Sequence, residues 1–123
     1  MEFIGKYREL NPSYQQYDSM KDHFSEDRYP NQDRIIDYLK NGITDCARIG
    51  VPRDVFTGET IRMEELGMND GVYTWFNTLA YYVDRYNLVL PEKFVAHILD
   101  PNNDIRRVRF MMKWERNHKS ERV

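Results

Sequence analysis

The pattern of apolar and polar positions predicts a first helix over residues 32–41. Asn31 precedes it as an N-cap, and Gly42 follows it as a left-handed C-cap. Asp33 lies in the first turn, where the helix dipole favours an acidic residue. The apolar stripe of this helix consists of Ile35, Ile36 and Leu39.

Two further helices, joined by a short connector, are predicted in the second half of the chain. The first runs from about Thr74 to Tyr86, because apolar residues recur there at i, i+3, i+4 and i+7. Asn87 can take the left-handed cap, Pro91 opens the next helix, and Pro101 ends it. We expect most of the aromatic core to come from this pair, with core positions at Trp75, Phe76, Leu79, Tyr82, Val83 and Tyr86.

Short strands and turns are predicted before this helix pair. The segment 43–49 reads as a strand on which the single cysteine, Cys46, is expected to be buried. Residues 54–61 indicate either a hairpin or a bent strand. Residues 69–71 have the sequence Asn-Asp-Gly and predict a turn, because all three residue types tolerate a positive φ.

Two stretches leave alternatives open. Phe3, Tyr7 and Leu10 are spaced like one face of a short helix, but residues 3–7 fit an edge strand equally well. In residues 105–116 a period of two fits better than a helical period. This favours a strand that closes the sheet.

The size and composition fit a single folded domain. The chain has 123 residues, of which 41% are hydrophobic, 14% aromatic and 31% charged, as is typical of globular proteins. We expect one α+β domain over residues 1–123, with three or four helices packed on a small, mostly antiparallel sheet. Residues 117–123 are expected to be frayed.

Several features predict a cytoplasmic protein without a membrane partner. One cysteine cannot form an internal disulfide, which suits a reducing compartment. The N-terminus lacks the continuous apolar region of a signal peptide. The longest mostly apolar runs fall far short of the ~20 residues that a membrane span needs.

The residue types that carry chemistry form no motif of a reactive site. None of His23, His97 and His118 has a partner at a metal-ligand spacing, and Cys46 has no neighbouring base. No Gly-rich loop precedes a helix. His23 lies between acids, but adjacent residues rarely point at one substrate. We therefore expect no catalytic residue, no metal and no cofactor.

Charge is divided unevenly along the chain. Residues 1–104 carry 11 Lys and Arg against 18 Asp and Glu, whereas residues 105–123 carry 7 against 2. The basic tail has three interpretations: a strand face that pairs with the acidic body, a contact with nucleic acid, or a disordered end. The net charge of −7 in the body counts against nucleic acid as the main ligand.

Three motifs resemble parts of a group of small bacterial cytosolic proteins. They are YPNQDRIIDYLKNG, RDVFTGE and DGVYTWFNTLAYYVDRYNLVLPEKFVAHIL, and together they cover about residues 29–99. That group has a similar succession of a YPN-capped helix, a DVFTGE turn and an aromatic helix pair. It is associated with immunity genes beside polymorphic or contact-dependent toxins. The resemblance implies a toxin-binding role and carries no catalytic residue over to this chain.

The expected function is therefore that of a non-catalytic, immunity-type or antitoxin-like protein that covers the active site or substrate surface of a cognate toxin. Many such toxins are nucleases with basic clefts, which an acidic, Tyr-rich face would complement. A solvated surface that binds nothing is the other interpretation of these acids. The alternative function is regulatory nucleic-acid binding through the basic C-terminal segment. The expected partner-binding residues are Glu59, Glu64, Glu65, Asp70, Tyr73 and Asp84.

Overall fold

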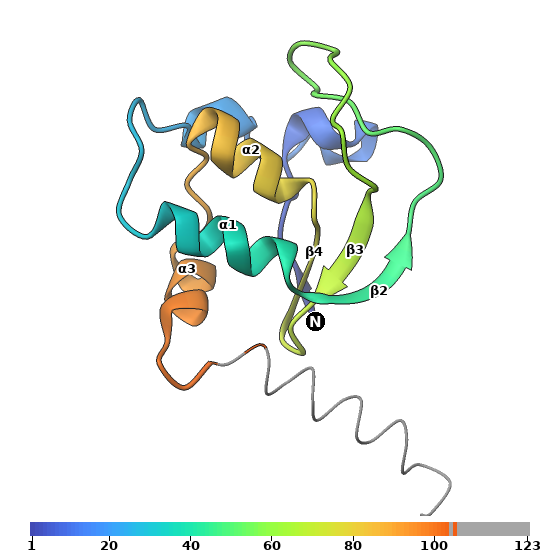
Figure 1. Cartoon of the computed structure of the whole chain (residues 1–123). Coiled ribbons are helices and arrows are strands. Elements are labelled where there is room, and N and C mark those ends of the chain that lie inside the picture. Colours follow the sequence, from blue (N-terminus) through green and yellow to red (C-terminus); the bar gives the residue numbers. More distant parts are fainter. Residues whose placement is uncertain (104, 106–123) are drawn as a thin grey trace, which may run out of the picture.

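The computed structural model describes residues 1–103 and 105, and in this part three α-helices pack against a four-stranded sheet (Figure 1). The strand predicted over 105–116 and the frayed end predicted over 117–123 lie outside the described residues, apart from Ile105. The helices are α1 (Gln32–Lys40), α2 (Leu79–Tyr86) and α3 (Glu92–Leu99), and the strands are β1 (Glu2–Phe3), β2 (Ile43–Ala47), β3 (Leu66–Asn69) and β4 (Tyr73–Phe76). The expected α+β class is confirmed.

The sheet is mixed, with the strand order β1-β4-β3-β2. The pairs β2–β3 and β3–β4 are antiparallel, whereas β1 runs parallel to β4 with Glu2 opposite Tyr73. The expectation of a mostly antiparallel sheet therefore fits two of its three pairings. Of the alternatives for residues 3–7, the edge strand is closer to what the structure has, since Phe3 ends β1.

The helix predicted from Thr74 is wrong at its start, because residues 73–76 form strand β4 and α2 begins only at Leu79. The strand sequence is Tyr-Thr-Trp-Phe, and aromatic and β-branched residues favour a pleated surface. The predicted turn at 69–71 is confirmed, and it returns the chain so that Met68 faces Trp75. Trp75 is fully buried, and its indole N–H donates to the carbonyl oxygen of Leu39 at 2.9 Å.

Two predictions around the start of β2 are also corrected. Gly42 does not have the positive φ of a left-handed C-cap. A Cβ there would lie 2.8 Å from the Trp75 ring and 3.0 Å from the Met68 Cβ, so glycine is needed for a close approach to the sheet. Cys46, expected to be buried, is exposed because β2 is an edge strand with a register shift between Thr44 and Cys46.

Apart from the start of α2, the predicted helix ends agree with the structure to within a residue or two, and the cap predicted at Asn31 also differs. Asn31 precedes α1 with a φ of 67° and makes no side-chain cap bond. Instead, the Gln32 side chain accepts the N–H of Tyr29 at 3.0 Å. The left-handed cap predicted at Asn87 is confirmed by its φ of 54°, and Pro91 directly precedes α3.

Most of the predicted aromatic core is buried, whereas Phe76 and Tyr86 are only half-buried. The first 30 residues add three 3-10 helices, η1 (Arg8–Leu10), η2 (Pro12–Tyr14) and η3 (Met20–His23). Within the described residues, no helix combines the length and the apolar character needed to cross a membrane.

Candidate partner-binding site

Residues 52–61, here called the clamped loop, form a compact excursion between β2 and β3. Its ends meet where the N–H of Ile61 donates to the carbonyl oxygen of Pro52 at 2.9 Å. At its tip, Gly58 has a φ of 75°, which glycine adopts at no steric cost, and its N–H donates to the carbonyl oxygen of Asp54 at 2.8 Å. Of the two predicted shapes, the loop is closer to the hairpin.

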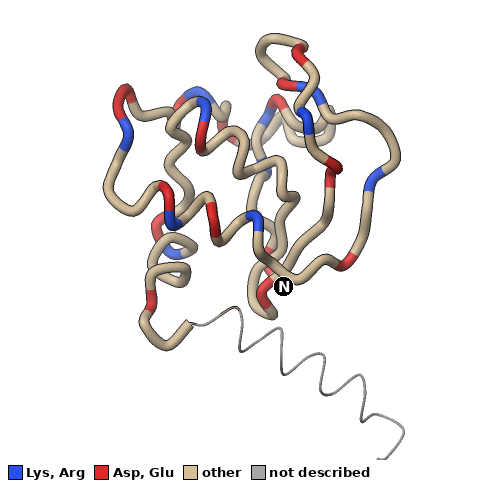
Figure 2. Tube along the Cα trace, in the orientation of Figure 1, with Lys and Arg blue, Asp and Glu red and all other residues tan. Residues whose placement is uncertain are grey.

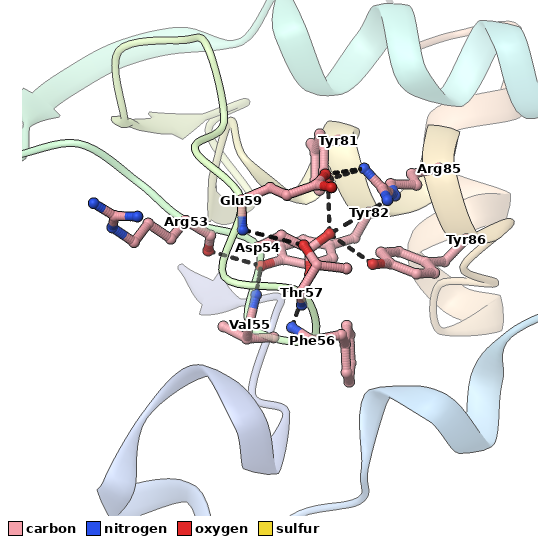
Figure 3. A network of polar contacts seen from close by, with 10 residues as sticks. All are labelled: Arg53, Asp54, Val55, Phe56, Thr57, Glu59, Tyr81, Tyr82, Arg85 and Tyr86. Atoms are coloured by element: carbon pink, nitrogen blue, oxygen red, sulfur yellow. Dashed lines mark hydrogen bonds and ion pairs between the residues drawn. The ribbon is translucent and has the colours of Figure 1, made fainter.

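The side chain of Asp54 fixes this loop from the inside. Asp54 is 1% exposed, and its Oδ1 accepts the N–H groups of Phe56 at 2.7 Å and of Thr57 at 3.2 Å. Its Oδ2 accepts the hydroxyls of Tyr81 at 2.7 Å and of Tyr86 at 2.6 Å (Figure 3). One carboxylate therefore closes the turn and joins it to α2.

The surroundings of Asp54 stabilise its charged form. Burial opposes ionisation, but hydrogen bonds from Tyr86, Tyr81 and two backbone amides outweigh it and hold the pKa of Asp54 below its ordinary value. Burial and the bond to Asp54 raise the pKa of both Tyr81 and Tyr86. The guanidinium of Arg85 lies 3.9 Å from Asp54 and pairs with Glu59 at 2.8 Å. At neutral pH the clamp is thus a carboxylate held by neutral phenols.

A third tyrosine of α2 holds the start of the loop. The Tyr82 hydroxyl accepts the N–H of Val55 at 3.1 Å and donates to the carbonyl oxygen of Arg53 at 3.4 Å (Figure 3). Burial raises the pKa of Tyr82 to about 12, so this hydroxyl keeps its proton at neutral pH. Three tyrosines of one helix therefore set the shape of the loop.

The outer side of the clamped loop offers an apolar side chain beside a small hollow. Val55 is 42% exposed and lines a hollow of about 190 Å³. The other residues that line the hollow are Leu10, Pro52, Arg53, Ile61, Glu65, Thr78 and Tyr82. An exposed apolar side chain therefore lies beside a hollow whose lining is both apolar and polar.

Three of the predicted partner-binding residues lie in or near the clamped loop. Glu59 belongs to it, and its side chain is largely exposed beside Arg85. Glu64 follows closely and is exposed. Glu65 lines the hollow, but its carboxylate is mostly covered, bound by Arg48 at 3.3 Å and by the Thr78 hydroxyl at 3.0 Å.

The other predicted partner-binding residues lie elsewhere, and Figure 2 shows the acids spread over several elements. Asp84 is exposed on α2 and pairs with Arg28 at 3.2 Å. Tyr73 is half-buried, with its ring centroid 4.9 Å from that of Phe94. Asp70 is 3% exposed, so its carboxylate faces the interior. The six residues thus do not share one face.

Asp70 belongs to a polar cluster that sequence reasoning missed. Its Oδ2 accepts the hydroxyl of Tyr38 at 2.7 Å and lies 2.9 Å from Nε2 of His97. The side-chain amide of Asn103 donates to the Tyr38 hydroxyl at 3.0 Å. These residues lie far apart in the sequence, and no local motif announces their contact. The cluster ties the β3–β4 turn to α1 and α3.

His23, which lies between acids in the sequence, borders a hollow of about 610 Å³. Its Nε2 lies 3.2 Å from an Asp18 carboxylate oxygen, on an exposed part of the surface. The described residues that line this hollow include no Ser, Thr or Cys.

Among residues 1–103 and 105, no three His, Cys, Asp or Glu side chains come together as a metal-binding group. No known protein family, curated protein or solved structure matches the chain.

Proposed function

We propose that this chain is a non-catalytic binding protein of the immunity type, which acts in the cytoplasm and neutralises a cognate toxin by covering its active site or substrate surface. One observation carries the proposal: the buried carboxylate of Asp54 uses four hydrogen bonds to hold a surface loop in one shape. A loop that is ordered before binding loses less conformational entropy on association. Loops positioned by a rigid scaffold commonly carry binding functions.

The chemistry of the clamped loop suits a basic protein surface. Val55 and the adjoining hollow supply the apolar contact that usually dominates affinity at the centre of an interface. Glu59 and Glu64 supply exposed acids in the clamped loop and just after it, and exposed charge at an interface mainly accelerates association. A nuclease toxin with a cationic cleft is the partner that fits both the apolar contact and the exposed acids.

The binding surface is narrower than the set of six residues predicted from the sequence. It keeps Glu59 and Glu64, with Glu65 at the wall of the hollow. It leaves out Asp70, which is buried, Tyr73, which packs inside the fold, and Asp84, which pairs with Arg28.

The buried carboxylates accept hydrogen bonds from within the fold, and this supports a binding function over a catalytic one. Asp54 and Asp70 are the buried acidic residues of the described chain, and both oxygens of each accept internal hydrogen bonds. A general acid or base needs to reach a substrate proton directly or through one water. These two carboxylates instead bond to their own turns and to helix side chains.

The first test measures binding of the full chain to the C-terminal domain of the protein encoded immediately upstream of its gene, together with rescue of growth in cells that express that domain. Val55→Asp should weaken binding about tenfold or more, because it puts a charge into a desolvated apolar contact. Val72→Asp is the matched control: Val72 is 52% exposed at the β3–β4 turn and should leave binding unchanged. Equal affinities of the wild-type chain and Val55→Asp would contradict the proposed surface.

A second test separates the clamped loop from the basic tail. Glu59→Lys with Glu64→Lys should weaken binding more at low salt than at high salt, because screening shortens the range of exposed charges. Reversing Arg107 and Arg109 should matter less. The opposite ranking, together with a salt-dependent gel shift on nucleic acid, would favour the alternative function, a regulatory nucleic-acid-binding protein.

A further inference from the structure

Two hollows of the surface adjoin at Glu65. One is the hollow of about 190 Å³ beside Val55, and the other is smaller, about 80 Å³. Phe3 and Phe76 line the smaller hollow, with their ring centroids 5.9 Å apart. The residues that line both hollows are Leu10, Glu65, Thr78 and Tyr82. Glu65 thus brings a carboxylate to the place where an aromatic-lined hollow meets the proposed binding surface.

The carboxylate of Glu65 is partly buried, and its hydrogen-bonding capacity is not used up. Its side chain is 18% exposed, and its two oxygens accept one bond each, from the Thr78 hydroxyl at 3.0 Å and from the Arg48 guanidinium at 3.3 Å. The bond from Arg48 is long, since an N–H that donates to a carboxylate from a cation usually lies at about 2.7–2.9 Å. A carboxylate has about four acceptor sites, so Glu65 can accept further donors.

Arg48 shows which chemistry this place holds. Its guanidinium lies over the Phe76 ring, 4.2 Å from the ring centroid, while it donates to Glu65. A guanidinium suits both contacts, because it is planar, weakly hydrated and able to stack on an aromatic face. The Arg48 side chain is nevertheless 57% exposed, and an ion pair with one largely exposed partner is weak. Another guanidinium can therefore take its place at little cost.

We infer that an arginine side chain of the protein partner binds Glu65 and displaces Arg48 from it. The guanidinium of the partner pairs with the carboxylate, and its aliphatic stem packs on the apolar residues that line the two hollows. Lysine fits less well, because its ammonium is a compact, strongly hydrated charge that does not match the planar carboxylate. This inference rests on the proposed function and names the residue type that the cationic partner presents.

The test measures the affinity of the full chain for the C-terminal domain of the protein encoded immediately upstream. Glu65→Gln should weaken binding about tenfold or more, because glutamine keeps the shape and an acceptor for Thr78 but not the charge. Arg48→Ala should tighten binding about two- to fivefold, because it removes the internal competitor. Arg34→Ala makes the same change of charge at an exposed position of α1 and reports the effect of net charge alone.

The combination of the two substitutions separates competition from net charge. In the Glu65→Gln chain, Arg48→Ala should change the affinity no more than Arg34→Ala does, since no carboxylate is left to compete for. Thermal melting of each variant checks that the fold is retained. On the other side of the interface, replacing one arginine of the domain with lysine should weaken binding to the wild-type chain but not to Glu65→Gln.

Two results would overturn the inference without touching the proposed function. One is a folded Glu65→Gln chain that binds as tightly as the wild type, and the other is weaker binding by Arg48→Ala, which would make Arg48 itself a contact of the partner. In both cases, loss of affinity in Val55→Asp would still support the clamped loop as the binding surface. A wild-type chain that does not bind the domain would instead contradict the proposed function and this inference together.

Discussion

Asp54 and Asp70 are two buried aspartates that organise two different turns with the same set of bonds. In each, Oδ1 accepts the N–H groups of the residues two and three positions later. In each, Oδ2 contacts two side chains from helices: Tyr81 and Tyr86 of α2 for Asp54, and Tyr38 of α1 and His97 of α3 for Asp70.

The two turns differ in what surrounds them. The turn of Asp70 joins the paired strands β3 and β4, and its side-chain partners come from two helices. The clamped loop of Asp54 has a single bridge between its own arms, and its tyrosine partners come from α2 alone. Figure 1 shows the connection between β2 and β3 extending beyond the end of the sheet where β3 begins. The same local motif therefore builds the fold in one place and displays a loop in the other.

The largest effect should come from the core next to the Asp70 turn. Trp75 packs on Tyr38, a partner of Asp70, and on Phe94. Trp75→Ala should lower the free energy of unfolding by about 3–5 kcal/mol, as truncation of large buried aromatics does. Chemical denaturation measures this change. An unchanged midpoint would mean that Trp75 is not a core residue.

Replacing the two aspartates tests the comparison itself. Asp70→Ala removes the acceptor of several hydrogen bonds and leaves their donors unsatisfied inside the fold. It should therefore lower the global free energy of unfolding by about 3 kcal/mol. Asp54→Ala should cost less, about 1–2 kcal/mol, because the clamped loop can open without unfolding the sheet.

Amide exchange distinguishes these outcomes. In Asp54→Ala, protection should be lost at Gly58 and Ile61 but kept at the strands, whereas Asp70→Ala should reduce protection throughout. Equal global costs for the two variants would show that the clamped loop is as integral to the fold as the β3–β4 turn.

Sequence reasoning succeeded where the signal was local. The turn at 69–71, helix α1 and the left-handed Asn87 follow from residue types that act on their own backbone. Strand β4 was missed because Trp75 and Phe76 continue the apolar pattern of α2, and only pairing with β3 decides between strand and helix.

The candidate site was predicted less well, for a related reason. Asp54 meets Tyr81 and Tyr86 across 27 and 32 residues of sequence, a distance that periodicity does not bridge. The turn that follows Asp54 could be predicted from the sequence, because an Asp followed by Thr57 and Gly58 favours a turn. Acidity alone placed Asp70 on the binding surface, although its carboxylate is buried.

Acid should loosen the clamped loop. Because folding lowers the pKa of Asp54, its contribution to stability is complete above the ordinary carboxyl pKa of about 3.9 and is lost as pH falls through the lower folded value. Amide exchange at Gly58, corrected for its intrinsic pH dependence, should therefore accelerate below about pH 4. Asp54→Asn is the control and should show no such step. A step of equal size in that variant would assign the pH dependence to another group.

The smallest effects should come from the individual tyrosine hydroxyls. Tyr81→Phe and Tyr86→Phe each remove one donor from Oδ2 of Asp54 and keep the ring, so each should cost about 0.5–1.5 kcal/mol of loop stability. The double variant should cost more than the two single variants together, because the first loss leaves the other hydroxyl still bound to Asp54.

Tyr14→Phe is the control, since the Tyr14 hydroxyl makes no hydrogen bond within the described residues, and it should change nothing. Strictly additive costs would mean that the two hydroxyls act independently. No cost in either single variant would show that the backbone alone holds the clamped loop, which would remove the main support for a preorganised binding site.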